Sequence, residues 1–315
     1  MFAILLDIQP EDEVIIPAYT FVSTANAFVL RGAKIVFTDS LPNHPNIDPS
    51  KIEALITSKT KAIVVVHYAG IACDMNAIQA IADKHGLAII EDAAQAIDAF
   101  YKGKPLGGIG DLAAFSFHET KNIIAGEGGM LAVNDARFAK RAEVIWEKGT
   151  NRSAFFRGEV DKYGWMDVGS SFLPSEIVAA FLYAQIEELP QIQAKRKSIW
   201  KRYFDELQPL QQEGKLQLPY IPNFATNNGH LFYLTCNSLS ERTALIQHLR
   251  KNDIHAVFHY LSLHLSPFYA SKHDGRELPN CERFADCLVR LPLFFELKES
   301  EQMRVLECVR SFYTE

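Results

Sequence analysis

The first half of the chain alternates short, wholly apolar runs with helix-like segments at a regular spacing. The apolar runs are strand candidates, because they are rich in Val, Ile and Phe and are bounded by polar or turn residues. They span residues 12–17, 34–38, 61–66, 87–90 and 112–117. Strands that are apolar throughout are typical of a parallel sheet with both faces covered. The pattern therefore predicts an α/β fold built on a mostly parallel sheet.

Helices are predicted between these strands. The candidates are residues 18–30, 49–57 and 76–85. Gly86 follows the last of them, where a glycine commonly ends a helix. Strand and helix thus follow each other at the spacing of βαβ units, which predicts a large α/β domain.

The second half of the chain has a different organisation. A helical region at 178–207 is interrupted by Pro190, and strand candidates at 231–235 and 255–260 lie on either side of a helix at 241–251. We therefore predict two domains. A large domain covers residues 1–190, and a small α+β domain covers residues 191–315.

Composition excludes several classes of protein. A formal net charge of −6 gives no reason to expect nucleic acid as a partner. No apolar run reaches the length that spans a membrane, so no membrane partner is expected. The five cysteines are scattered, and no two form a Cys-x-x-Cys pair, so neither a zinc site nor a disulfide framework is indicated. These observations favour a reduced, cytoplasmic setting without a bound metal.

Distinctive polar side chains follow the predicted strands directly. His67 follows the strand at 61–66, Asp92 and Gln95 follow the next strand, and Ser116 and Lys121 lie at the end of the last. In open parallel sheets the ligand crevice lies outside the carboxyl ends of the strands. We therefore expect these groups to gather along one edge of the sheet, although strand ends are polar in many proteins.

Lys121 precedes the glycine-dense turn Gly126-Glu127-Gly128-Gly129. Glycine lets the main chain approach another group closely. A lysine amine becomes a nucleophile where its ammonium is partly desolvated, and its usual chemistry is then capture of a carbonyl. The alternative is an exposed lysine before a flexible turn.

These residue types suit pyridoxal phosphate. This cofactor needs a lysine for its aldehyde and an acid that keeps its pyridine nitrogen protonated, so that the ring acts as an electron sink. Lys121 and Asp92 fit the two roles, Phe21 suits the ring face, and Ser116 suits the phosphate. Asp92 also suits a helix N-cap, and a phenylalanine such as Phe21 is more often part of a core.

Several short motifs are spread over nearly the whole chain. They are Pro17 to Asn26, Val66 to Gly70, Glu91 to Gln95, Ser116 to Asn122, Gly126 to Gly129, Phe258 to Tyr260 and Arg290 to Phe294. Together they resemble the DegT/DnrJ/EryC1/StrS family of nucleotide-sugar aminotransferases. The resemblance implies a PLP-dependent transferase type I fold, which is the aspartate aminotransferase-like fold.

The resemblance also implies roles for single residues. Lys121 is similar to the lysine that forms the Schiff base, and Asp92 to the acid at the ring nitrogen. Gln95 corresponds to the side chain beside the 3-oxygen of the cofactor. Phe21 looks like the ring that stacks on the pyridine, and Ser116 like a phosphate ligand.

Five further residues are candidates for binding. Much of the family has a Gly-Tyr-Asn-Tyr-Arg motif, and Ser171 stands where its Asn binds the phosphate in the neighbouring subunit. By resemblance His259 and Tyr260 approach the active site, with a packing role as the alternative. Arg152 and Arg157 suit the diphosphate of a nucleotide sugar, because guanidinium groups pair well with phosphate oxygens. Exposed loop arginines are the alternative.

The implied reaction moves an amino group from glutamate, leaving 2-oxoglutarate, to a dTDP-linked 4-keto-6-deoxyhexose. The product would be dTDP-4-amino-4,6-dideoxygalactose for a surface polysaccharide. Family members share their active sites between subunits, which implies a homodimer. A sugar dehydratase on the same scaffold is an alternative, but such relatives carry His in place of the lysine, and Lys121 argues against this activity.

The beginning of the chain departs from the family pattern. Family members begin several dozen residues earlier, and residues 1–10 look like the tail of a helix whose start cradles the cofactor phosphate. The sequence is thus either shortened or that of a protein that has lost part of its site. A non-catalytic remnant is the third alternative, and we expect the chain as given to bind pyridoxal phosphate more weakly than a longer relative.

Overall fold

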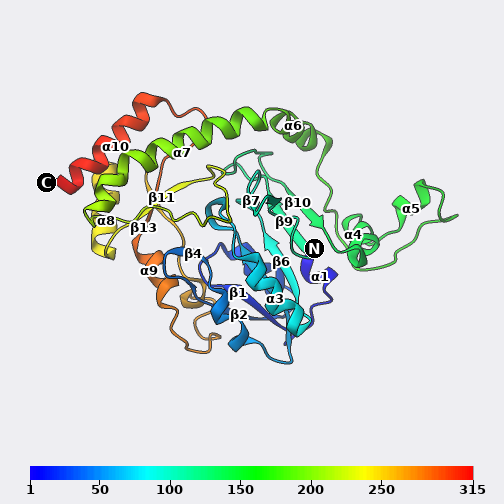
Figure 1. Cartoon of the computed structure of the whole chain (residues 1–315). Coiled ribbons are helices and arrows are strands. Elements are labelled where there is room, and N and C mark those ends of the chain that lie inside the picture. The colour runs from blue at the N-terminus through cyan, green and yellow to red at the C-terminus, as the bar shows by residue number, and fades with distance from the viewer. Residues whose placement is uncertain (315) are drawn as a thin grey trace.

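A six-stranded sheet forms the centre of the computed structural model, which describes residues 1–314 (Figure 1). Its strand order is β10-β9-β6-β5-β1-β2. The strands are β1 (Glu13–Pro17), β2 (Lys34–Thr38), β5 (Thr60–Val66), β6 (Ala88–Asp92), β9 (Leu112–Ser116) and β10 (Gly129–Val133). All pairings are parallel except that of β10 with β9. The prediction of a mostly parallel sheet is confirmed.

The register of the central strands aligns their carboxyl ends. Val66 of β5 pairs with Asp92 of β6, and Asp92 in turn lies beside Ala114 of β9. The residues that follow these three strands therefore leave the sheet at the same edge. This alignment brings the candidate site residues that follow the strands to one edge of the sheet.

Two of the predicted helices differ from the structure. Residues 49–57 form two separate 3-10 turns, η1 (Pro49–Lys51) and η2 (Glu53–Leu55), so the single predicted helix is wrong. The Asp48 side chain caps the start of η1 by accepting a hydrogen bond from the Ser50 backbone, but the backbone is already extended at Ile56, so the helical turns end there. The helix predicted at 18–30 is α2 (Val22–Val29), because the backbone at Phe21 is still extended.

The third predicted helix is confirmed as α3 (Met75–His85). The Asp74 side chain accepts a hydrogen bond from the Ala77 backbone at its start. Gly86 ends the helix with a φ of +66°, a left-handed conformation that glycine adopts without strain. The smaller elements of this half are α1 (Phe2–Leu5), β3 (Ser40–Leu41), β4 (His44–Ile47), η3 (Tyr68–Gly70), β7 (Phe100–Tyr101), β8 (Lys104–Pro105) and η4 (Ala136–Phe138).

A helical segment leaves the sheet after β10. It contains α4 (Ala139–Trp146), α5 (Arg152–Phe156) and α6 (Glu176–Glu187). We call residues 147–175 the arm; they run out to α5 at the margin of the molecule and return to α6 (Figure 1). The long helix α7 (Leu189–Gln212) then crosses to the other sheet, and Pro190 lies in its first turn, where the missing N–H of proline has little cost.

The C-terminal part holds a three-stranded antiparallel sheet of order β11-β13-β12. Its elements are β11 (Phe232–Thr235), α8 (Leu239–Lys251), β12 (Val257–Phe258), η5 (Leu263–Leu265), α9 (Pro279–Cys287), β13 (Leu288–Leu291) and α10 (Glu299–Thr314). The strand predicted at 255–260 is therefore shorter than expected. The predicted strand at 231–235 and the helix at 241–251 are confirmed within two residues.

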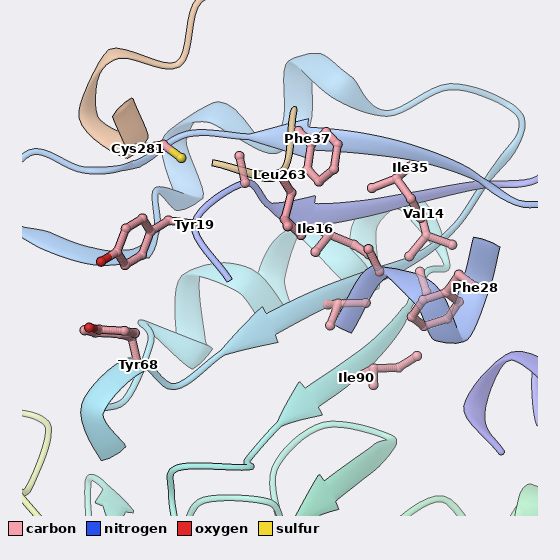
Figure 2. Packing of buried hydrophobic residues seen from close by; sticks show 14 of the residues in the cluster. Val14, Ile16, Tyr19, Phe28, Ile35, Phe37, Tyr68, Ile90, Leu263 and Cys281 are labelled. Carbon is pink, nitrogen blue, oxygen red and sulfur yellow. The ribbon is translucent and has the colours of Figure 1, made fainter. Parts of the chain in front are cut away.

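The core of the large sheet also contains side chains from the C-terminal part, among them Tyr233 of β11 and Leu288 of β13. Figure 2 shows the core of the large sheet, in which Leu263 from the C-terminal part lies beside Ile16 and Phe37, and Cys281 lies on the side of Tyr19. The hydroxyl of Tyr269 also accepts a hydrogen bond from the Ile35 backbone at 2.6 Å. The domain boundary near residue 190 stays a prediction.

Within residues 1–314, no helix combines the length and the apolar character that crossing a membrane would need.

Candidate active site

Asp92 ends strand β6 at the aligned edge of the sheet. One carboxylate oxygen accepts a hydrogen bond from the Thr24 hydroxyl at 2.6 Å, and the other accepts one from the Ala94 backbone at 3.1 Å. Thr24 belongs to α2, so the helix after β1 orients the acid that follows β6. The carboxylate is thus held in place while part of it stays accessible.

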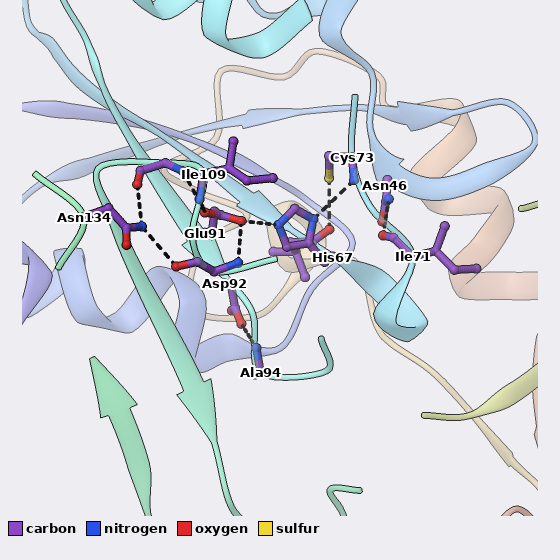
Figure 3. Close-up of polar contacts among 12 residues, drawn as sticks. Asn46, His67, Ile71, Cys73, Glu91, Asp92, Ala94, Ile109 and Asn134 are labelled. Carbon is purple, nitrogen blue, oxygen red and sulfur yellow. Dashed lines mark hydrogen bonds and ion pairs between the residues drawn. The ribbon is translucent and has the colours of Figure 1, made fainter. Parts of the chain in front are cut away.

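Glu91 holds the same strand end from the opposite face (Figure 3). It is fully buried and accepts hydrogen bonds from His67 at 2.9 Å and from the backbones of Gly107, Ile109 and Gly110 at 2.8, 2.7 and 2.7 Å. Burial raises the pKa of Glu91, but the bonds from His67 and the backbone outweigh it and lower the pKa overall. Successive residues of a strand point to opposite faces, so this anchor fixes the neighbouring Asp92.

The loop that encloses Glu91 depends on one glycine. Gly107 has a φ of +84°, and a Cβ there would lie 2.3 Å from the ring of Phe115. Only glycine fits both conditions. The loop can therefore bring its backbone N–H groups close to the carboxylate of Glu91.

Lys121 lies between β9 and β10, where the sequence predicted it. Its side chain is half-buried. Burial lowers the pKa of its amine, Asp92 opposes this effect through its negative charge, and the positive charge of Arg290 adds to it. The net lowering makes the neutral, nucleophilic amine more available than in a free lysine.

Gln95 is buried and connects three segments around the site. Its Oε1 accepts a hydrogen bond from the Ala69 backbone at 2.6 Å, and its Nε2 donates one to the Tyr260 hydroxyl at 3.0 Å. The Asn228 side chain donates to the Gln95 backbone carbonyl at 2.8 Å. Gln95 therefore links the end of β5 to the C-terminal part of the chain.

Phe21 is exposed and Ser116 is partly exposed, so both side chains can contact a ligand. The Phe21 ring is 56% exposed at the start of α2 and lies 6.1 Å from the Tyr260 ring, between centroids. Among the residues that the structure describes, the Ser116 hydroxyl accepts one long hydrogen bond, 3.4 Å from the His118 backbone nitrogen. A large exposed ring and a hydroxyl with free capacity suit the face and the phosphate of a planar cofactor.

His259 and Tyr260 come to this edge from the C-terminal part. His259 Nδ1 lies 3.1 Å from the Tyr68 hydroxyl, and its Nε2 accepts from the Arg290 guanidinium at 3.3 Å. Burial, with the positive charges of Arg290 and Lys121, lowers the pKa of His259 to about 2. The ring is therefore neutral at physiological pH and serves as a hydrogen-bonding group rather than a cation.

A cavity of about 540 Å³ opens beside Lys121. The loop after β9, the helices α6 and α7, and the segment after β13 line it. Arg196 and Arg290 take part in this lining, whereas Asp92, Gln95 and Phe21 do not. Lys121 thus stands at the border between the strand-end groups and the cavity.

The arm residues are not brought to this place within the single chain. Arg152 pairs with Glu147 at 3.1 Å, and Arg157 pairs with Glu143 at 2.9 Å. Ser171 forms a strand bridge with Glu147 and is exposed. Figure 1 shows α5 at the margin of the molecule, away from β6 and β9.

Two residues of the site have no distinctive sequence signal. Thr24 reaches Asp92 from a helix that lies 68 positions earlier, and Arg290 reaches the cavity from β13. Arg290 lies in a motif that the sequence singled out, but no local pattern gave it a role. Both contacts depend on how separate elements pack.

The residues present fit pyridoxal phosphate. An amine with a lowered pKa, an oriented carboxylate, an exposed aromatic ring and a hydroxyl with free capacity lie along one edge of the sheet. This donor set matches the aldehyde, ring nitrogen, ring face and phosphate of that cofactor. Among residues 1–314, by contrast, no group of three or more His, Cys, Asp or Glu side chains is placed to hold a metal ion.

Comparison with known proteins gives matches over nearly the whole chain. The sequence profile of the DegT/DnrJ/EryC1/StrS aminotransferase family matches residues 1–310. The spore coat polysaccharide biosynthesis protein SpsC of Bacillus subtilis (strain 168) is 35% identical over 312 residues, which are 96% of this chain and 79% of SpsC.

Two solved structures also match nearly the whole chain. DesV of S. venezuelae, in complex with a ketimine intermediate, superposes with a TM-score of 0.90 at 31% identity, over 99% of this chain and 81% of DesV. The putative sugar aminotransferase Spr1654 of Streptococcus pneumoniae, in its PMP form, has a TM-score of 0.90 at 26% identity and covers 99% of this chain and 84% of its own.

Proposed function

The chain belongs to the DegT/DnrJ/EryC1/StrS aminotransferase family and is a pyridoxal phosphate-dependent sugar aminotransferase, and we propose that its donor is glutamate and its acceptor a dTDP-linked 4-keto-6-deoxyhexose. The product of this reaction is dTDP-4-amino-4,6-dideoxygalactose, with 2-oxoglutarate as the second product. The similarity to a polysaccharide biosynthesis protein supports a role in making a surface polysaccharide.

The observation that carries the proposal is that Asp92 lies near enough to Lys121 for its negative charge to act on the pKa of the amine. Pyridoxal phosphate, when bound, supplies an electron sink that spreads the charge left after the donor loses its α-proton. Asp92, oriented by Thr24, holds a proton at the pyridine nitrogen. Lys121 moves the α-proton at its Nζ, and its lowered pKa leaves more of the amine in the neutral form that can act as a base.

The remaining site residues hold the cofactor and position the substrates. Gln95 and Tyr260 are hydrogen-bonded to each other and close the site from the side of the C-terminal part. Phe21 covers the ring face, and Ser116 binds the phosphate. His259, neutral and bonded to Tyr68, contributes a polar group to the sugar side.

The arm supports a homodimer with shared sites. Trp165 is 86% exposed, and Met166 and Phe172 are also exposed. Exposed apolar patches of this kind are typical of protein interfaces. In such a dimer Arg152, Arg157 and Ser171 serve the site of the second copy, where the arginines bind the diphosphate. The five cysteines are buried and scattered along the sequence, which fits a reducing, cytoplasmic setting.

One assay tests the proposal. Purified protein is loaded with pyridoxal phosphate and given glutamate and a panel of keto-sugar nucleotides that differ in base and sugar. We expect 2-oxoglutarate and an amino sugar in equal amounts, with the dTDP-4-keto-6-deoxyhexose as the best acceptor. Loss of water from the sugar without consumption of glutamate would instead support the dehydratase alternative.

A further inference from the structure

His230 is a buried histidine just before β11, and the proposed function gives it no role. Burial holds its pKa well below the ordinary value, so the ring is neutral at physiological pH. Four ionisable side chains from other parts of the fold lower this pKa further, namely Lys121, Arg196, Arg290 and His259. A neutral ring therefore lies within electrostatic range of the Lys121 amine.

The hydrogen bonds of Asn122 determine which ring nitrogen of His230 carries the proton. Asn122 Nδ2 donates to Gln193 Oε1 at 2.7 Å and to the backbone carbonyl of Asn228 at 3.0 Å. Because a carbonyl can only accept, this contact identifies the nitrogen end of the Asn122 amide. The oxygen end, Oδ1, then faces His230 Nδ1 at 2.7 Å. His230 Nδ1 must therefore donate, and in a neutral ring Nε2 carries no proton.

The residue that His230 holds in this way follows Lys121 directly in the chain. Asn122 lies buried in the loop after β9 and lines the cavity beside the lysine. Its partners come from two other places in the fold, since Gln193 belongs to α7, whereas Asn228 and His230 precede β11. We call these four residues the Asn122 cluster. The cluster ties the main chain at the lysine to the long helix and to the C-terminal sheet.

The Asn122 cluster is also fixed to the edge of the large sheet. The Asn228 side chain donates to the backbone carbonyls of Gln95 and Ile97, both at 2.8 Å. The chain makes room for this side chain with a glycine, because a Cβ on Gly70 would lie 2.0 Å from Asn228 Oδ1. The cluster is thus held by the same strand ends that carry the candidate site.

We propose that Asn122 and His230 are positioning residues that hold Lys121 in the geometry and the partly buried state that its reaction needs. This inference rests on the proposed function, because it concerns the base of that reaction. A misplacement of about 1 Å can lower a rate by about 100-fold. Without the donor at position 230, Asn122 Oδ1 would be a buried acceptor with no partner, and the loop would have to shift to satisfy it. A neutral ring also adds no charge near Lys121, on whose pKa Asp92 and Arg290 act in opposite directions.

The test compares His230→Asn with His230→Gln in the full chain. Both replacements are neutral amides, but the asparagine nitrogen falls near the position of the ring Nδ1 and the glutamine nitrogen near that of Nε2. His230→Asn can therefore keep the bond to Asn122, and His230→Gln cannot. His248→Gln is the matched control, because His248 lies on α8 and contacts Ser311 of α10.

Three quantities are measured for each protein. The first is the rate at which protein freed of cofactor captures pyridoxal phosphate, followed by absorbance from neutral to alkaline pH. The second is kcat with glutamate after loading, and the third is the free energy of unfolding. The pH at which capture reaches half its maximal rate reports the pKa of the Lys121 amine, which a purely structural role of His230 would leave unchanged.

We expect His230→Gln to capture pyridoxal phosphate roughly 10-fold more slowly at neutral pH, and its kcat to fall roughly 10- to 100-fold, because the amine is misplaced. The pH of half-maximal capture should rise, since a loosened loop exposes the amine to water. His230→Asn should stay within about threefold of wild type in both rates, because it keeps the hydrogen bond. His248→Gln should behave like wild type.

Equal rates and an equal pH of half-maximal capture for His230→Gln and wild type would refute the assignment and leave the proposed function intact. Equal losses in His230→Asn and His230→Gln would also refute it, as would a lower free energy of unfolding with an unchanged pH of half-maximal capture. Should His230→Gln fail to fold, Asn122→Ala decides: a raised pH of half-maximal capture supports the assignment, and the wild-type value refutes it. Wild-type protein that captures no pyridoxal phosphate would refute the proposed function and this inference together.

Discussion

The edge of the six-stranded sheet and the arm contrast in how they hold their polar side chains. At the sheet edge, Asp92 and Gln95 are fixed by partners from distant parts of the chain, such as Thr24 and Tyr260. In the arm, residues 147–175, the charged side chains pair within the arm or with the helix α4 just before it, and large apolar side chains are exposed. The sheet edge thus draws on distant parts of the chain, whereas the arm draws on nearby ones.

This difference separates two kinds of contribution to the enzyme. In the proposed enzyme the sheet edge supplies the groups that act on the cofactor, and their contacts lie within the single chain. The arm is proposed to contribute through a second copy of the chain. Substitutions at the sheet edge should therefore lower kcat, whereas substitutions at the proposed interface should change the mass measured by sedimentation.

The largest effect is expected for Lys121→Ala. Removing the amine removes both the covalent anchor and the base, so turnover should fall by about 10⁴-fold or more. The yellow colour of the loaded protein should also be lost. The measurement is kcat with glutamate together with the absorbance spectrum, and Lys104→Ala, at an exposed lysine of β8, is the control. Retained activity in Lys121→Ala would contradict the assignment of the active site to the edge of the six-stranded sheet.

Asp92→Asn should have the next largest effect. An amide cannot hold a proton at the pyridine nitrogen by charge, so kcat should fall by about 10²- to 10³-fold, as for removal of one preorganised electrostatic group. The cofactor should remain bound, since Lys121 is unchanged. Asp83→Asn, on the outside of α3, should leave kcat unaltered. Equal kcat values for Asp92→Asn and Asp83→Asn would show that Asp92 has a structural role only.

Glu91→Gln should lower stability rather than act on the chemistry directly. Breaking a buried charged network typically costs about 3–5 kcal/mol, so the free energy of unfolding near neutral pH should fall by roughly this amount. The pKa of Glu91 is lowered in the folded state from 4.5. Its stabilisation is therefore present above pH 4.5 and is lost as the pH falls through the folded pKa.

The measurement is denaturant unfolding of wild type and Glu91→Gln from neutral to acidic pH. The difference between them should shrink below pH 4.5, where protonation of Glu91 begins to remove the advantage of the wild type. Glu188→Gln, at an exposed position, is the control. A difference that stays constant with pH would contradict the role of the Glu91 charge.

The smallest effect on the single chain is expected for Phe181→Glu in α6. This side chain is 49% exposed, so the change should alter the free energy of unfolding of one chain by less than about 0.5 kcal/mol. It should nevertheless convert the proposed dimer to a monomer, because α6 follows the arm directly, and we expect its exposed Phe181 ring to belong to the same apolar contact between the two copies. Sedimentation would show the change in mass, with Glu187→Ala on the same helix as the control. A Phe181→Glu protein that remains a dimer would place the interface elsewhere.

The sequence predicts the sheet edge well, because its signal is local. Asp92 and Lys121 each follow an apolar strand, and parallel strands bring such positions together whatever the helices between them do. The contacts of Thr24 and Arg290 leave no such mark, since they arise from the packing of α2 and β13 against other elements. The helix predicted at 49–57 instead forms two short 3-10 turns, and the backbone is already extended at Ile56.

The central claim is that Lys121 and Asp92 bind one molecule of pyridoxal phosphate, and borohydride trapping tests it most directly. Protein loaded with the cofactor is reduced with borohydride, digested and analysed by mass spectrometry. We expect one phosphopyridoxyl group per chain, on Lys121, in wild type and in Asp92→Asn. Labelling of another lysine, or of none, would contradict the account.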